Sequence, residues 1–177
     1  MLNDLEHHAT TFLINAKRAI QDVCALVCLF WTLDKQHSKF HLLAKDIERR
    51  LGSDNQLVKF VNGYADGVTK VVELRNFQEH GTREKRLHVE NFRLMPSNQI
   101  LAPVWYIDGE SPRDIASDMT SISNFLVSLA EGVFVGCVDQ RLSRRFPLCF
   151  ELIETPDPKI PVRFRLTVDI SKLVLPS

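Results

Sequence analysis

The first half of the chain repeats apolar residues in the rhythm of helices. Over residues 5–31 they recur at every third or fourth position, which is the spacing of one face of an amphipathic helix. This pattern predicts a long helix from about Asp4 to Leu33, with Asn3 as its N-cap. The same spacing predicts a second helix from about Ser38 to Leu51, which Gly52 is placed to end.

A third apolar stripe predicts a helix that begins at residue 53 or 54 and ends at His80, just before Gly81. The stripe continues at the same rhythm onto Arg75, so a charged side chain is expected at a core-facing position. Gly63 and Gly67 lie within this helix and each costs about 1 kcal/mol relative to alanine. Close packing of another helix is the preferred reason for both glycines, and contact with a ligand is the alternative.

Beyond Gly81 the period changes to that of strands. Alternation on both sides of a Pro-Ser-Asn turn predicts a β-hairpin over residues 87–107. A fourth helix is expected from Ser111, as N-cap before Pro112, to about Leu142. Alternation returns in residues 146–172 and predicts a C-terminal strand pair. The expected fold is therefore mainly α: one domain over residues 1–177, with a helical bundle over 4–142, a hairpin between its third and fourth helices, and a C-terminal β appendage.

Charge and composition exclude several classes of protein. Lysine plus arginine and aspartate plus glutamate both number 22, so a nucleic-acid or membrane partner would need a local patch. The apolar stretch at residues 23–31 is far shorter than the ~20 residues that span a bilayer. The acidic N-terminus is unlike a secretory signal. Absence of CxxC spacing predicts reduced core thiols and a cytoplasmic protein without membrane contact, the cysteines being Cys24, Cys28, Cys137 and Cys149.

Arg75 and His80 are the residues that most need a chemical explanation. Burying an unpaired guanidinium is costly, so Arg75 is expected to have a partner nearby. Glu79 lies one helical turn later and would form an ordinary ion pair with Arg75. A histidine in the last turn of a helix also complements the helix dipole. On this interpretation all three residues have a purely structural role.

The combination Arg75-Asn76-x-x-x-His80 at the end of a third helix resembles the HEPN superfamily, in which an Arg, a few intervening residues and a His define the motif. The likeness covers residues 4–140 in helix order but only Arg75 to His80 in signature. It implies a HEPN-like four-helix bundle that forms a homodimer with both motifs lining one cleft, where many members cut RNA without a metal. Residues five apart on a helix diverge by about 140°, so Arg75 and His80 are not expected to converge within one chain.

The resemblance also implies roles for the motif residues. His80 would act as general base on a ribose 2′-hydroxyl or as general acid toward the leaving oxygen. Arg75 would hold the scissile phosphate and offset its developing charge. Asn76 would orient the imidazole or bond to the phosphate. Glu79 does not fit this scheme, because a carboxylate there would pair with Arg75 or repel RNA.

The most basic stretch of the chain follows the motif and offers two interpretations. Arg83, Lys85 and Arg86 would contact RNA phosphates if they border the cleft, or they belong to a solvated loop. Thr82 stands where HEPN toxins that are neutralised by a nucleotidyltransferase carry a modified tyrosine. That pairing is therefore not expected, while a different antitoxin or another protein partner stays open.

Other chemistries lack a motif. The chain has no glycine-rich phosphate loop and no HExxH, so no cofactor is expected. The histidines His7, His8, His37 and His41 do not have the spacing of metal ligands, so no metal is expected. Two functions remain. The first is a metal-independent HEPN-type endoribonuclease acting at a dimer cleft in stress response or defence. The alternative is a non-catalytic dimeric HEPN-like module that binds RNA, a nucleotide or a protein partner.

Overall fold

The computed structural model describes residues 4–32, 39–82, 85–142, 148–155, 157, 159 and 162–168. Within these ranges the chain forms four helices, namely α1 (Leu5–Cys28), α2 (Phe40–Leu51), α3 (Gln56–His80) and α4 (Ile115–Arg141). The same ranges contain short strands that pair in small antiparallel sheets. The fold is therefore mainly helical, as the apolar spacing predicts.

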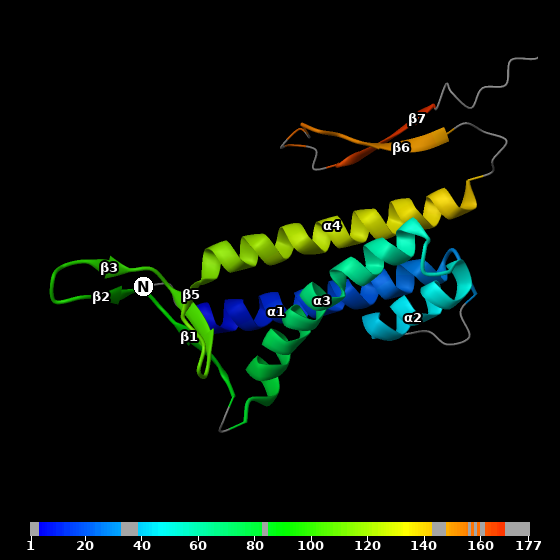
Figure 1. Cartoon of the computed structure of the whole chain (residues 1–177). Coiled ribbons are helices and arrows are strands. Elements are labelled where there is room, and N and C mark those ends of the chain that lie inside the picture. Colours follow the sequence, from blue (N-terminus) through cyan, green and yellow to red (C-terminus); the bar gives the residue numbers. More distant parts are fainter. Residues whose placement is uncertain are drawn as a thin grey trace, which may run out of the picture.

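The bundle core is built from one face of each helix. In Figure 1, α1 and α4 run in the same direction, α3 runs the opposite way, and α2 lies at the C-terminal end of α1. Leu129 and Val133 of α4 are fully enclosed. The buried positions of α1 follow the predicted spacing, and they are Ala9, Leu13, Ala16, Ile20, Val23, Cys24 and Val27.

A second apolar cluster closes the end of the bundle where α1 begins and α3 ends. It packs beneath a sheet of three strands, β1 (Leu87–Glu90), β4 (Val104–Ile107) and β5 (Arg113–Asp114). Trp105 of β4 is fully buried in this cluster, and its indole N–H donates to Asp118 Oδ2 at 2.6 Å. Because Asp118 lies in the first turn of α4, this hydrogen bond ties the sheet to the bundle.

The predicted hairpin over residues 87–107 is correct in its limits but not in its continuity. The inner strands β1 and β4 pair with each other, while β2 (Arg93–Leu94) and β3 (Ile100–Leu101) form a separate ladder. The break on the returning side contains Pro103, which has no N–H to donate to a partner strand. Asn98 adopts a positive φ of 59° in the turn at the tip.

The predicted start of the fourth helix is wrong. Arg113 and Asp114 pair with β4 instead of opening a helix, so Ser111 and Pro112 lie outside α4. The helix begins at Ile115, and the Asp114 carboxylate caps it by accepting the backbone N–H of Ser117 at 2.7 Å. The pairing of β5 with β4 therefore decides where the helix begins, and the local Ser-Pro pattern does not.

The other helix ends differ less from the prediction. α1 stops at Cys28, short of Leu33, which lies outside the described residues together with Asn3. α3 begins at Gln56, where the Asn55 side chain accepts the N–H of Leu57. Glycines end α2 and α3 as predicted, at Gly52 with φ 82° and at Gly81.

The predicted C-terminal strand pair is confirmed as β6 (Leu148–Leu152) and β7 (Phe164–Val168). This hairpin lies along α4 on the side away from α1 (Figure 1). Arg163 links the two parts, because its guanidinium donates to Ser128 Oγ and lies 3.8 Å from Glu131 on α4. The hairpin forms a sheet of its own and does not join the β1–β4–β5 sheet.

Within the described ranges α4 is the one helix long and apolar enough, by length and composition, to cross a membrane. The apolar spacing predicts this helix, but the stretch compared with a membrane span was residues 23–31 and not α4. Mostly buried core helices of soluble proteins pass the same test, but only 17% of the apolar window of α4 is buried, although the helix packs against both α1 and α3. Cytoplasmic location and lack of membrane contact therefore stay predictions.

Glycines allow α3 and α4 to approach closely. A Cβ at Gly67 of α3 would lie 2.5 Å from Phe125 Cε2 of α4. On α4, a Cβ at Gly132 would clash with the ring of Phe60. A Cβ at Gly63 would have no atom within 4 Å. The close-packing explanation is thus confirmed for Gly67 and wrong for Gly63.

This difference predicts opposite effects for one substitution at two positions of α3. Gly63→Ala should raise the free energy of unfolding by up to about 1 kcal/mol, because alanine favours a helix interior. Gly67→Ala should lower it, because overpacking costs about 1–3 kcal/mol and outweighs the same helical gain. Urea denaturation followed by circular dichroism measures both. Equal effects at the two positions would contradict the close approach at Gly67.

Candidate functional site

The predicted motif residues occupy the last two turns of α3, beside the sheet that closes the bundle. Leu74 is 6% exposed and fills the core position, so the apolar stripe passes to Leu74 and Arg75 lies next to it. The Arg75 side chain is still largely covered, with 17% of its surface exposed. A charge this enclosed requires a partner in the protein.

Glu79 is that partner, one turn further along α3. Its Oε2 forms an ion pair with Nη1 of Arg75, as the spacing predicts. The same Nη1 lies 3.5 Å from Oδ1 of Asn76. Nε of Arg75 is buried and has no hydrogen-bond partner among the described residues. The guanidinium is therefore held mainly at one end, by its own helix.

His80 is brought to the same carboxylate. Its Nε2 lies 3.1 Å from Oε2 of Glu79, and 70% of its side chain is exposed. The expectation that Arg75 and His80 do not converge within one chain is therefore wrong in one respect. Their Cβ atoms diverge on the helix, but the long Glu79 side chain lies between them and contacts both.

The basic residues after the motif fold back onto the end of α3. Lys85 Nζ lies 5.8 Å from the ring centroid of Phe77, a cation–π contact. The Cγ of Arg86 lies so near Gly81 that a Cβ there would be 2.8 Å away. Both residues remain exposed, so their charged groups are open to a ligand. Arg83 lies outside the described residues.

This arrangement can bind an anion at its rim more easily than at its centre. His80, Lys85 and Arg86 present exposed donors. Nη1 of Arg75 is engaged by Glu79, so a phosphate that took this nitrogen would meet the Glu79 carboxylate beside it. The attraction between Arg75 and the phosphate would then be offset by repulsion between the phosphate and the Glu79 carboxylate.

A further cluster, which the sequence prediction missed, lies on the outer face of β1 and β4. His88 Nε2 lies 2.7 Å from Asp108 Oδ1, and Asp108 Oδ2 accepts the backbone N–H of Arg86. The rings of His88 and Tyr106 stack with centroids 5.0 Å apart, and the Tyr106 hydroxyl donates to Glu90 at 3.0 Å. The alternation of buried and exposed residues along the strands could have revealed this cluster. Residues that alternate with the buried ones lie together on the opposite face of the sheet.

Metal ligands do not gather in the described part of the chain, where no group of three or more His, Cys, Asp or Glu side chains could share an ion. His41 lies on α2 and the neighbouring His7 and His8 on α1, whereas His37 lies outside the described residues. Burial raises the pKa of the Cys24 thiol to about 11 and that of Cys137 to about 12. Both are therefore enclosed, unreactive thiols, as predicted for core cysteines.

Asp108 gives the stability of the sheet a predicted pH dependence. The hydrogen bond from His88, then the N–H of Arg86, hold the pKa of the Asp108 carboxyl below its usual range. A lowered pKa in the folded state means that this stabilisation is present above about pH 4 and is lost as the pH falls through the folded-state value. Asp108→Asn should therefore lower the thermal midpoint at pH 6, and the gap to the wild type should close in acid.

Calorimetric melting between pH 6 and pH 2.5 measures this gap. The control is Asp66→Asn, which removes an exposed aspartate of α3 that has no ion pair among the described residues. This control should leave the midpoint almost unchanged at both ends of the range. A gap between wild type and Asp108→Asn that stays constant in acid would contradict the assigned role.

Comparison with protein families, with curated proteins and with solved structures finds no match to this chain. The likeness to HEPN proteins therefore consists of the order of the helices and the stretch from Arg75 to His80. In the structure this stretch lies at the end of α3, the third of the four described helices. Membership of the superfamily stays a proposal.

Proposed function

We propose that this chain is a non-catalytic HEPN-like module that forms a homodimer and binds RNA at the C-terminal end of α3. The observation that carries the proposal is the ion pair between Arg75 and Glu79. Because Glu79 neutralises the guanidinium, Arg75 is not free to offset charge that develops on a scissile phosphate. The largely covered cation of the motif is therefore already paired with a carboxylate.

The exposed groups around this ion pair support RNA as the ligand. His80, Lys85 and Arg86 form a polar rim on the last turn of α3 and the segment after it. Contacts of this kind supply affinity for phosphates without reading a sequence and without chemistry. A second copy related by a two-fold axis would present the same rim again and double the number of phosphate contacts.

A metal-independent endoribonuclease is the second candidate, favoured by the contact between His80 and Glu79. A carboxylate 3.1 Å from an imidazole nitrogen can fix the tautomer and orientation of the ring. The exposed His80 could then take the proton of a ribose 2′-hydroxyl. In this scheme Arg75 would leave Glu79 for the phosphate, and Asn76 would help to hold it.

The proposal predicts RNA binding that depends on the rim. Lys85→Gln combined with Arg86→Gln should weaken binding of a fluorescein-labelled single-stranded RNA and reduce the salt slope by roughly 0.7 per lost contact. Fluorescence anisotropy at several salt concentrations measures both. The control is Lys45→Gln, which removes an exposed lysine of α2 at the far end of the bundle (Figure 1). Equal binding by all three proteins would contradict the rim as the RNA site.

Cleavage separates the two candidates. The purified protein, with EDTA present, is incubated with a mixed pool of end-labelled RNAs beside His80→Ala and Arg75→Ala. The non-catalytic proposal expects no cleavage above these variants. Products with 2′,3′-cyclic phosphate ends from the wild type alone would overturn it and establish the ribonuclease. Glu79→Gln in the same cleavage assay tests the ion pair directly. This variant keeps the shape of the side chain and removes the negative charge that pairs with Arg75.

A further inference from the structure

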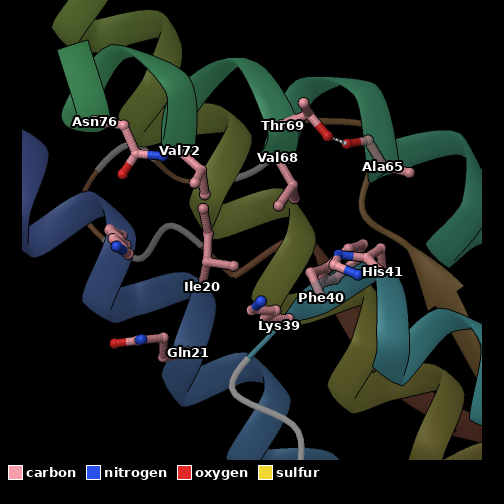
Figure 2. Close-up of a pocket in the computed structure, with 11 residues that line it drawn as sticks. Ile20, Gln21, Lys39, Phe40, His41, Ala65, Val68, Thr69, Val72 and Asn76 are labelled. Atoms are coloured by element: carbon pink, nitrogen blue, oxygen red, sulfur yellow. Dashed lines mark hydrogen bonds between the residues drawn. The ribbon is translucent and has the colours of Figure 1, made fainter. Parts of the chain in front are cut away.

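A pocket of about 470 Å³ lies between α1, α3 and the first turn of α2 (Figure 2). This volume falls within the roughly 300–1,000 Å³ typical of small-ligand sites. We propose that the pocket binds a small organic anion with an aliphatic body and a carboxylate or phosphate head. This site does not depend on the proposed RNA binding, because its lining lies mostly outside the motif.

The floor of the pocket is apolar and mainly aliphatic. Ile20 of α1 and Val68 and Val72 of α3 face one another across it (Figure 2). The exposed ring of His41 lies at the rim, whereas Phe40 is the aromatic residue of the floor and is only 4% exposed because its ring belongs to the bundle core. A ring enclosed in this way offers little face for a flat base to stack on. The floor therefore fits an aliphatic group better than a nucleobase.

The rim of the pocket has one sign of charge. Lys17, Lys39 and His41 line it, and none of its lining residues carries a carboxylate. Neither lysine forms an ion pair with another described residue. In a chain of zero net charge, two lysines beside one cavity are a local excess of positive charge. An anionic head group would offset it.

The start of α2 adds backbone donors to this rim. Lys39 is the N-cap residue, with an extended backbone and no side-chain capping bond. The first N–H groups of a helix have no partner within it, so those of Phe40 and His41 can bond to an anion near Lys39. The two lysines supply charge, and these N–H groups supply direction.

Amide side chains mark the other edges of the pocket. Gln21 and Asn76 both line it, and Figure 2 shows Asn76 at one end and Lys39 and His41 toward the other. Asn76 also lies 3.5 Å from Arg75, so the pocket and the motif share one side chain. The Thr69 hydroxyl is turned to the carbonyl of Ala65 and is less available to a ligand.

Isothermal titration calorimetry of the full chain with hexyl phosphate and with hexanoate tests the proposal. At least one of these anions should bind, and Lys17→Gln combined with Lys39→Gln should weaken that binding by about tenfold or more. Lys45→Gln, on α2 but outside the pocket, should not change it. Neutral 1-hexanol should bind at least about tenfold more weakly than the better anion. The ratio of the two anions then identifies the head group.

Three kinds of result would overturn the assignment. The first is no binding of either anion at millimolar concentration to folded protein. The second is equal binding of 1-hexanol, or unchanged affinity in the double lysine variant, because both would remove the role of charge. The third is tighter binding of adenosine monophosphate than of either alkyl anion, which would replace the aliphatic body with a base. None of these results bears on RNA affinity, which the anisotropy measurement reports separately.

Discussion

The structure depends on how closely α3 and α4 approach each other. Gly132 of α4 has no side chain at the point where the ring of Phe60 from α3 packs. Gly67 of α3 likewise has none where the ring of Phe125 from α4 packs. Each helix thus packs a phenylalanine against a glycine of the other helix. These two contacts fix the rotation of α3 about its own axis. That rotation turns Leu74 inward and leaves the neighbouring Arg75 at the edge of the core.

The helices could be predicted from sequence because burial of one face imposes its spacing on the apolar residues. The limits of the elements could not, where they depend on contacts between distant parts of the chain. Asp114 caps α4 because Arg113 and Asp114 pair with β4 as strand β5, so the helix can begin only after them. No local sequence pattern shows that pairing. The hairpin divides for a similar reason, since Leu87 of β1 and Trp105 and Ile107 of β4 belong to the apolar cluster, while β2 and β3 extend beyond it.

For the candidate site, the sequence predicts the Arg75–Glu79 pair, because residues four apart on a helix are neighbours. It does not predict that His80 meets the same oxygen, since helix geometry places Cβ atoms and not the end of a flexible glutamate. The pocket was beyond prediction altogether. Its lysines stand on α1 and at the start of α2, its amides stand on α1 and α3, and only the packed bundle brings them together.

The middle and the end of α3 are buried in two different apolar clusters. Val61 and Val68 belong to the bundle core, whereas Leu74 and the partly buried Phe77 belong to the cluster beneath the sheet. The motif therefore rests on the smaller of two apolar clusters, and parts of a protein with fewer buried contacts open at lower free energy. Amide hydrogen exchange in the last turns of α3 would then follow the opening of the sheet, while the first turns follow unfolding of the whole bundle.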